Sequence, residues 1–418
     1  MLPACLAIAV LYIASTALTP LYPIYRHEFV FSELVVTEIY AVYVVGNLAS
    51  LFFFGRVSDQ AGRRVTALVA FAITALSAVL FLTARGTGGL MAARIVNGFS
   101  AGLGAGALTA WIAELEPRGN RARAAVAASG ANLLGLAVGA VLAGLLAELA
   151  PAPLRTVFVV YLGILIVVGL LLSRVKETVE HPKRATRSLS LKPRIGVPRE
   201  IRAAFIAPAC MAFASFALGG FYGALVPGVL SEKLNNTAPS VTGAVVGLFF
   251  ACAGATAAAS RSLRSRTAMF TGAGLLFAGL ALLIGAELAR SMFLVLAATV
   301  VAGSAMSLGY RGSLQVVNEI APQEKRAEVV STYLLTCYSG NAIPVIGVGL
   351  LSLPFGTTAA HIIFAGVCAA LGLSAIVAGV ASRRRGAATP SRRPSRAVGS
   401  TRDSDAPRQS GRTGTSWR

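Results

Sequence analysis

Long apolar runs recur along the whole chain and constrain its fold more than any other feature. We count twelve, each about twenty residues long, near 3–23, 36–55, 65–84, 88–114, 123–147, 155–173, 204–230, 240–260, 267–286, 291–316, 327–352 and 359–381. About twenty residues of helix cross a hydrocarbon core of about 30 Å, and a lipid-facing backbone must satisfy its hydrogen bonds within its own helix. The sequence therefore predicts an all-α integral membrane protein with twelve transmembrane helices.

The composition agrees with this interpretation. Of the 418 residues, 56% are hydrophobic and 13% are charged, whereas soluble domains carry about 25% charged residues. The net charge of +20 does not predict a nucleic-acid partner, because the basic residues lie between the apolar runs and in the tail. The five cysteines lie inside apolar runs without paired or metal-type spacing, so we expect buried thiols instead of disulfides, and no metal site. We also expect no cofactor.

The loops alternate in charge. One set carries basic clusters around Arg63, Arg121, Arg264 and Lys325, and nine basic residues between 174 and 202; the other set carries only isolated basic residues. The positive-inside rule places the first set and both termini in the cytoplasm. We therefore expect a multi-pass protein of the plasma membrane (the inner membrane), in contact with lipid and monomeric.

The loops also suggest domain boundaries. Residues 1–174 form a predicted N-terminal six-helix bundle, 175–203 a cytoplasmic linker, and 204–382 a C-terminal six-helix bundle. Residues 383–418 hold ten arginines together with Ser, Pro, Gly and Thr, a composition that cannot bury a core, so we expect a disordered basic cytoplasmic tail.

The two halves repeat each other at a constant offset of 205 residues. "AELEPRGNRA" (113–122) aligns with "NEIAPQEKRA" (318–327), and the matched glycines are Gly98 and Gly303, Gly104 and Gly309, Gly135 and Gly340, and Gly144 and Gly349. The repeat predicts two bundles related by an axis along the membrane normal. Bundles of this kind usually rock about a central site.

A polar hairpin, "GRVSDQAGRR" (55–64), separates the second and third runs. It is either an ordinary positive-inside loop or a functional cluster, since Asp59 and Arg63 stand four residues apart, within reach of one another on a helix. Here the chain resembles the major facilitator superfamily of secondary transporters, whose pattern is Gly-x-Leu-Ala-Asp-Arg-x-Gly-Arg-Arg. This sequence supplies Gly55, Asp59, Gly62, Arg63 and Arg64, but departs from the pattern at 57, 58 and 60. The resemblance implies that the cluster joins Glu114 and latches the two bundles on the cytoplasmic side.

Two more motifs resemble this superfamily, in particular its 12-helix drug:proton antiporters. "LMAARIVNGFSAG" (90–102) places Arg94 inside a span; the resemblance implies a role in proton coupling, with Glu38 as a candidate partner, and the alternative is an arginine that snorkels to the interface. In the fifth run, Gly130, Gly139 and Gly144 keep the spacing of the antiporter signature, although alanines replace its central proline and one glycine. These glycines predict close helix packing.

The substrate cavity is expected between the bundles. The candidate residues are Tyr22, Tyr25, Asn97, Trp111, Tyr222, Tyr310 and Arg311, with Tyr12 and Phe221 as further aromatic candidates. For each aromatic residue the alternative is plain packing, and for Arg311 it is a structural ion pair with Glu319.

These features favour a secondary transporter over an ATP-driven one, because the sequence has no phosphate-binding glycine loop. We expect no enzyme, since nothing in the sequence suggests covalent catalysis. We expect a proton-coupled exporter, an antiporter that moves small amphiphilic compounds or drugs by alternating access. The alternatives are a proton-coupled symporter of small organic anions, held by Arg94 and Arg311, and a sensor that does not transport.

Overall fold

The computed structural model describes residues 1–55, 57–179 and 195–388, with side chains as far as Ala381. All regular structure in these residues is helical, in the order α1 (Leu2–Ala17), η1 (Thr19–Leu21), α2 (Tyr22–Phe29), α3 (Glu33–Phe54), α4 (Val57–Ala61), α5 (Arg63–Thr83), α6 (Thr87–Glu114), α7 (Arg121–Leu149), α8 (Pro153–Ser173), η2 (Arg199–Ile201), α9 (Arg202–Ala224), α10 (Val226–Gly228), η3 (Val229–Lys233), α11 (Pro239–Ala259), α12 (Ser265–Ala289), α13 (Met292–Ile320), η4 (Gln323–Lys325), α14 (Arg326–Phe355) and α15 (Thr357–Ala388). Within the described residues, twelve stretches are long and apolar enough to cross a membrane. The predicted all-α fold with twelve spans is confirmed.

The first and seventh spans are interrupted near one end. The first consists of α1, the short 3-10 turn η1 and α2, and prolines stand at Pro20 and Pro23. Proline lacks the N–H that a continuous helix needs, which accounts for the break. The seventh continues from α9 through α10, which contains Pro227, into the π-helical turn η3. π-Helical turns are rare and often occur at functional sites.

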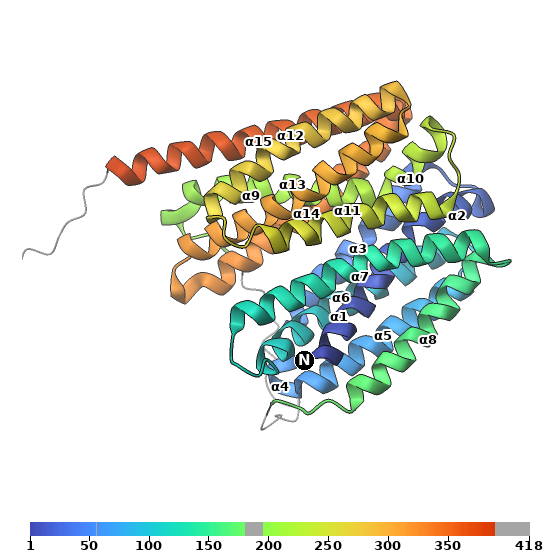
Figure 1. Cartoon of the computed structure of the whole chain (residues 1–418), viewed down its shortest axis with the longest axis horizontal. Coiled ribbons are helices and arrows are strands. Elements are labelled where there is room, and N and C mark those ends of the chain that lie inside the picture. The colour runs from blue at the N-terminus through green and yellow to red at the C-terminus, as the bar shows by residue number, and fades with distance from the viewer. Residues whose placement is uncertain (56, 180–194, 389–418) are drawn as a thin grey trace, which may run out of the picture.

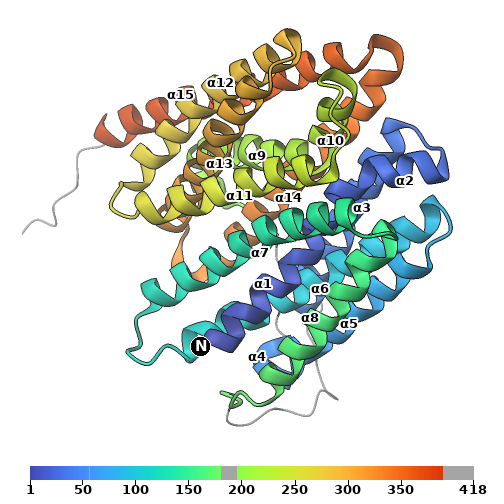
Figure 2. The ribbon, with the colours of Figure 1, turned by 45° about the vertical axis from the view of Figure 1, so that its right-hand side comes forward.

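The helices form two bundles, α1–α8 and α9–α15 (Figure 1). In both views the bundles lie close together where α2 and α10 meet, and they diverge toward α4 and the C-terminal end of α15 (Figures 1 and 2). We call these the α2 side and the α4 side. The principal contacts between bundles pair α7 with α11 and α3 with α14.

The sequence repeat reappears in the packing of the two bundles. A Cβ on Gly98 of α6 would lie 2.0 Å from the Tyr43 carbonyl oxygen, and one on Gly303 of α13 would lie 2.3 Å from that of Phe249. Gly135 and Gly340 approach the carbonyl oxygens of Ala9 and Phe213 in the same way, at 2.2 and 2.4 Å. Matched glycines thus hold matched helix pairs at backbone contact, as small residues do between membrane helices.

Polar contacts between the two bundles concentrate toward the α2 side. In the described part of the chain, four hydrogen bonds cross between the bundles, and all come from the α2-side half of the spans: Arg26 to Glu232 (2.7 Å), Thr19 to the Gly223 carbonyl (2.9 Å), Tyr40 to Asn341 (3.2 Å) and the Ser240 amide to Glu148 (3.1 Å). The bundles are therefore closed against each other on the α2 side.

The predicted tail needs one correction. Helix α15 continues to Ala388, into the segment expected to be disordered, because a helix does not end where its lipid-facing surface ends. The remainder of the tail, 389–418, and most of the linker, 180–194, lie outside the described residues.

Candidate functional site

A charge cluster forms on the α4 side around Arg63, the first residue of α5. Its guanidinium forms ion pairs with Asp59 and, at 2.9 Å, with Glu114, and donates a hydrogen bond to Ser58 at 2.7 Å. Gly62 precedes it with φ of 102°, a conformation that favours glycine. The structure thus brings together the residues that the hairpin motif predicts.

The linker supplies two members of this cluster that the motif did not indicate. The Glu177 carboxylate accepts hydrogen bonds from the backbone amides of Arg63 and Arg64, both at 2.9 Å, and Thr178 donates to Glu114. A carboxylate at the first turn of a helix satisfies free N–H groups and complements the helix dipole. All partners belong to the N-terminal bundle or the linker, so the described contacts of the cluster do not reach the other bundle in this conformation.

Arg94 lies deep inside the N-terminal bundle, on α6. Its side chain is nearly inaccessible and donates hydrogen bonds to the Ser15 carbonyl (3.0 Å) and the Tyr22 hydroxyl (3.1 Å). The guanidinium carbon lies 5.5 and 5.2 Å from the ring centroids of Tyr40 and Tyr43. Cation–π contacts, one carbonyl oxygen and one hydroxyl group therefore hold this buried charge.

Half-buried aromatic side chains gather between the bundles, near the middle of the spans. We call them the aromatic wall: Tyr12 on α1, Tyr40 and Tyr43 on α3, Phe216 on α9, Tyr310 on α13 and Tyr338 on α14. The Phe216 ring packs edge-on against Tyr310 and Tyr338, with centroids 5.3 and 5.9 Å away. Tyr43 and Tyr338 belong to one apolar cluster that crosses between the bundles.

Comparison with known proteins decides the family. The family model described as Major Facilitator Superfamily matches residues 4–343. The chain belongs to the Major Facilitator Superfamily. A comparison with curated protein sequences gives no match. Among solved structures, a bacterial homolog of the human lysosomal transporter Spinster, inward-facing and occupied, is similar at a TM-score of 0.67 and 16% identity over 91% of this chain and 96% of that one.

Two further solved structures share the fold. A D-xylose-proton symporter matches with a TM-score of 0.69 and 16% identity, over 90% of this chain and 96% of that one. The inward-open xylose transporter XylE from E. coli matches with a TM-score of 0.71 and 15% identity, over 90% and 94% of the two chains. At these identities the likeness concerns the fold, and it agrees with the packing of two repeated bundles.

Most of the expected cavity residues of this major facilitator lie elsewhere. Trp111 is buried in the N-terminal core and its indole N–H donates to the Lys176 carbonyl (3.2 Å), because a buried indole needs a partner and the linker backbone passes there. Tyr222 is buried in the C-terminal core, stacked on Phe249 with centroids 4.2 Å apart. Tyr25 and Asn97 are also buried, whereas Tyr310 stands in the aromatic wall.

Arg311 does not face the space between the bundles either. Its guanidinium donates to the backbone carbonyl and, at 2.7 Å, the hydroxyl of Ser260, and to the Arg261 carbonyl at 2.9 Å. Helix α13 continues to Ile320, past the end of α11 at Ala259, so Arg311 stands level with that end. A cation there satisfies terminal carbonyl groups and complements the helix dipole. Among the described residues Arg311 forms no ion pair with Glu319, and it does not join Arg94 in a site that could hold an organic anion.

The expected pair of Arg94 and Glu38 is not formed. Among the described residues no ion pair joins them, and the Arg94 guanidinium points to α1 and to the rings of Tyr40 and Tyr43. On a helix Glu38 stands about 200° from Tyr40, which directs its carboxylate away from the arginine.

The three signature glycines of α7 divide into two kinds. A Cβ on Gly139 would lie 2.5 Å from the Ile13 carbonyl oxygen of α1, and one on Gly144 would lie 2.5 Å from the Pro239 carbonyl oxygen at the start of α11. Among the described residues, a Cβ on Gly130 would meet nothing within 4 Å, so this glycine makes no close helix contact there. The first turns of α7 are mostly exposed, and at Gly130 no other described helix lies close to its backbone.

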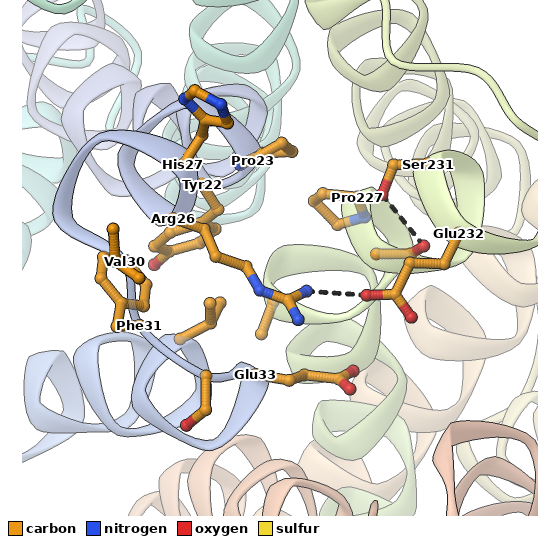
Figure 3. Close-up of a pocket in the computed structure, with 14 residues that line it drawn as sticks. Tyr22, Pro23, Arg26, His27, Val30, Phe31, Glu33, Pro227, Ser231 and Glu232 are labelled. Carbon is orange, nitrogen blue, oxygen red and sulfur yellow. Dashed lines mark hydrogen bonds and ion pairs between the residues drawn. The ribbon is translucent and has the colours of Figure 1, made fainter.

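A pocket of about 610 Å³ lies on the α2 side, between the two bundles. Its charged residues are Arg26 and Glu33 from the N-terminal bundle and Glu232 from the C-terminal bundle; the other lining residues labelled in the close-up are Tyr22, Pro23, His27, Val30, Phe31, Pro227 and Ser231 (Figure 3). Arg26 reaches across the pocket to Glu232 (Figure 3). This pocket thus lies beside the ion pair that joins the bundles.

Sequence reasoning missed most of the aromatic wall, and of the pocket it identified only Tyr22. Tyr40 and Tyr43 are three residues apart and share one helix face, a spacing that could have identified them. No local signal identified Phe216, Tyr338 or the pair of Arg26 and Glu232, since their partners are distant in the chain.

Proposed function

We propose that this major facilitator is a proton-driven exporter that moves small amphiphilic compounds by alternating access. The aromatic wall carries the proposal, because aromatic side chains from both bundles offer large apolar contact area and hydroxyl groups at their rims. The described carboxylates of α3, α6, α13 and α14 stand within the first or last two turns of these helices. Neutral amphiphiles therefore suit the wall better than compounds that need a central counter-charge.

We also propose that the α4 side faces the cytoplasm of a plasma membrane, because the basic clusters lie there. In this orientation the structure is closed toward the exterior. The cluster around Arg63 would then latch the bundles when the cytoplasmic side closes, and the glycine contacts of α7 with α1 and α11 support the antiporter assignment.

One observation favours a second candidate, a symporter of small organic anions. Arg94 has no carboxylate partner among the described residues, and a buried guanidinium suits a carboxylate or phosphate ligand. With Arg311 directed elsewhere, such an anion would depend on Arg94 alone, beneath the rings of Tyr40 and Tyr43.

The test uses proteoliposomes that contain the full chain and a trapped pH-sensitive dye. A panel of neutral amphiphilic antibiotics and small carboxylates is added without an imposed gradient, and empty liposomes provide the background. Protons that move against a neutral amphiphile would support the exporter, whereas protons that move together with a carboxylate would support the symporter. Absence of proton movement with every amphiphile would overturn the main proposal.

A further inference from the structure

A buried acid–histidine pair lies in the C-terminal bundle near the α2 side. Glu287, near the end of α12, approaches His361, near the start of α15, with 2.8 Å between Oε2 and Nδ1. Their side chains are 3% and 2% exposed. The Phe221 ring of α9 packs edge-on against the imidazole, with centroids 5.0 Å apart.

This geometry leaves one site open for a proton. A carboxylate only accepts hydrogen bonds, so a neutral His361 must carry its hydrogen on Nδ1 and direct the free lone pair of Nε2 elsewhere. Nε2 is buried and has no hydrogen-bond partner among the described residues. A proton that binds to Nε2 creates an imidazolium that stays paired with the Glu287 carboxylate, so no other bond has to break.

The pair is linked by charges to the closure between the bundles. The other carboxylate oxygen of Glu287 lies 3.9 Å from Nζ of Lys233 in η3. Lys233 directly follows Glu232, whose carboxylate holds Arg26 of the N-terminal bundle at 2.7 Å. Within one π-helical turn, Lys233 therefore faces the buried pair, and its neighbour Glu232 forms the ion pair that joins the bundles.

The pocket on the α2 side lies beside the residues that surround the pair, and its lining includes Glu232, the neighbour of Lys233. Glu33, Ser231 and Glu232 line it, and the carboxylates of Glu33 and Glu232 face the same space as the Arg26 guanidinium (Figure 3). The charged groups around the pair are Lys233 and Glu232 on η3, Glu33 on α3 and Arg26 on α2. Arg290 follows α12, and its backbone N–H donates to the Glu287 carbonyl. Helix α9 contributes the uncharged Phe221.

We propose that Glu287 and His361 form a proton-binding site that is loaded from the α2 side and that weakens the closure there when it is protonated. Without the proton, the carboxylate attracts Lys233 and holds η3 in place. With the proton, the pair is neutral overall, Lys233 loses this attraction, and the segment that carries Glu232 is released from α12. As the site of the coupling proton, the pair rests on the proposed proton-driven function.

The experiment measures the closure itself and needs no substrate. Thr19 is fully buried where it bonds to Gly223 across the bundles, so Thr19→Cys reacts with a membrane-impermeant methanethiosulfonate only when the α2 side opens. The rate is measured in right-side-out vesicles from pH 8 to 5.5, the interval in which histidine side chains in general change charge. At each pH, the labelling rate of Thr19→Cys is divided by the rate of the same variant that also carries His361→Gln. This ratio removes the effect of pH on the reactivity of the thiol itself. The chain without Thr19→Cys gives the background labelling of the other cysteines.

We expect this ratio to rise at least about fivefold on acidification, the lower end of couplings between two sites. The matched control, His27→Gln, removes a histidine of the pocket and should keep the rise, whereas Glu287→Gln should abolish it. A ratio that does not change with pH, or a rise that disappears in His27→Gln, would overturn the proposal.

A second measurement observes His361 directly in a chain that keeps this residue, so it does not depend on whether the His361 or Glu287 variants fold. The chain has three histidines, His27, His181 and His361, so a chain labelled with carbon-13 histidine gives three signals, and single replacement of His27 and His181 assigns the third. The signal of His361 should change together with the labelling ratio as the pH is lowered, and a signal that stays unchanged would refute the proton site. Neither measurement uses a substrate. A result against the proton site can therefore be distinguished from a result in which no amphiphile of the panel moves protons.

Discussion

Gly144 of α7 and Gly243 of α11 face each other in direct contact where the two bundles meet on the α2 side. A Cβ on either glycine would stand 3.1 Å from the Cα of the other, and 2.5 or 2.4 Å from a carbonyl oxygen of the facing helix. Backbone-to-backbone contact of this kind needs residues without side chains. The closure of this transporter on the α2 side therefore depends on both glycines.

Gly144→Ala should hold the bundles apart on the α2 side. Its methyl group would press on the Pro239 carbonyl oxygen, and overpacking costs about 1–3 kcal/mol, so the labelling rate of Thr19→Cys should rise about tenfold. Gly130→Ala is the matched control, because the same change in the same helix meets open space. Equal rates in the two variants would show that the glycine contact does not limit closure.

Reversing the charge of Arg26 or of Glu232 alone should weaken the closure on the α2 side, whereas reversing both charges together should preserve it. Arg26→Glu or Glu232→Arg places like charges together, and exposed pairs contribute about 0.2–1 kcal/mol, so each single change should raise Thr19→Cys labelling about two- to fivefold. The double variant should return to the parent rate. About 1 M salt, with a Debye length of about 3 Å, should reduce the differences; a double variant as open as the singles would contradict a direct pairing.

Tyr338→Leu should weaken binding of amphiphiles to the aromatic wall. Aromatic pairs contribute about 0.5–1.5 kcal/mol, so the KM for the best-transported member of the panel should rise about two- to tenfold, and Tyr338→Phe should retain most of the affinity. Phe293→Leu is the control, since this ring is 78% exposed at the start of α13. An unchanged KM in Tyr338→Leu would place the substrate elsewhere.

Arg311→Gln should lower stability and leave substrate choice unchanged. The guanidinium joins α13 to the end of α11, and loss of a charged hydrogen-bond donor costs about 1–3 kcal/mol, so the midpoint of thermal unfolding in detergent should fall. The ratio of transport rates for a carboxylate and a neutral amphiphile should stay at the parent value. A selective loss of carboxylate transport would restore Arg311 to the substrate site.

Much of this architecture follows from the sequence because its causes are local or periodic. Apolar runs of membrane length predict twelve helices, and the constant offset of 205 residues predicts two bundles, since a repeated sequence repeats its helix contacts. The hairpin that precedes α5 was also readable, because Asp59, Gly62 and Arg63 stand at spacings that a helix end brings together.

Tertiary structure alone decided which way the polar side chains point. The sequence predicted Arg311 as a cavity residue, but α13 extends past the end of α11, so Arg311 contacts Ser260 there. Trp111, also predicted for the cavity, donates a hydrogen bond to the linker backbone. Glu287 and His361 are 74 residues apart, and Arg26 and Glu232 come from opposite bundles. The sequence by itself determined the helices and their repeat, because the length of each apolar segment and the spacing of its small residues can be read directly along the chain. The partners of its buried charges depend on helix ends, rotations and crossings that only the folded chain defines.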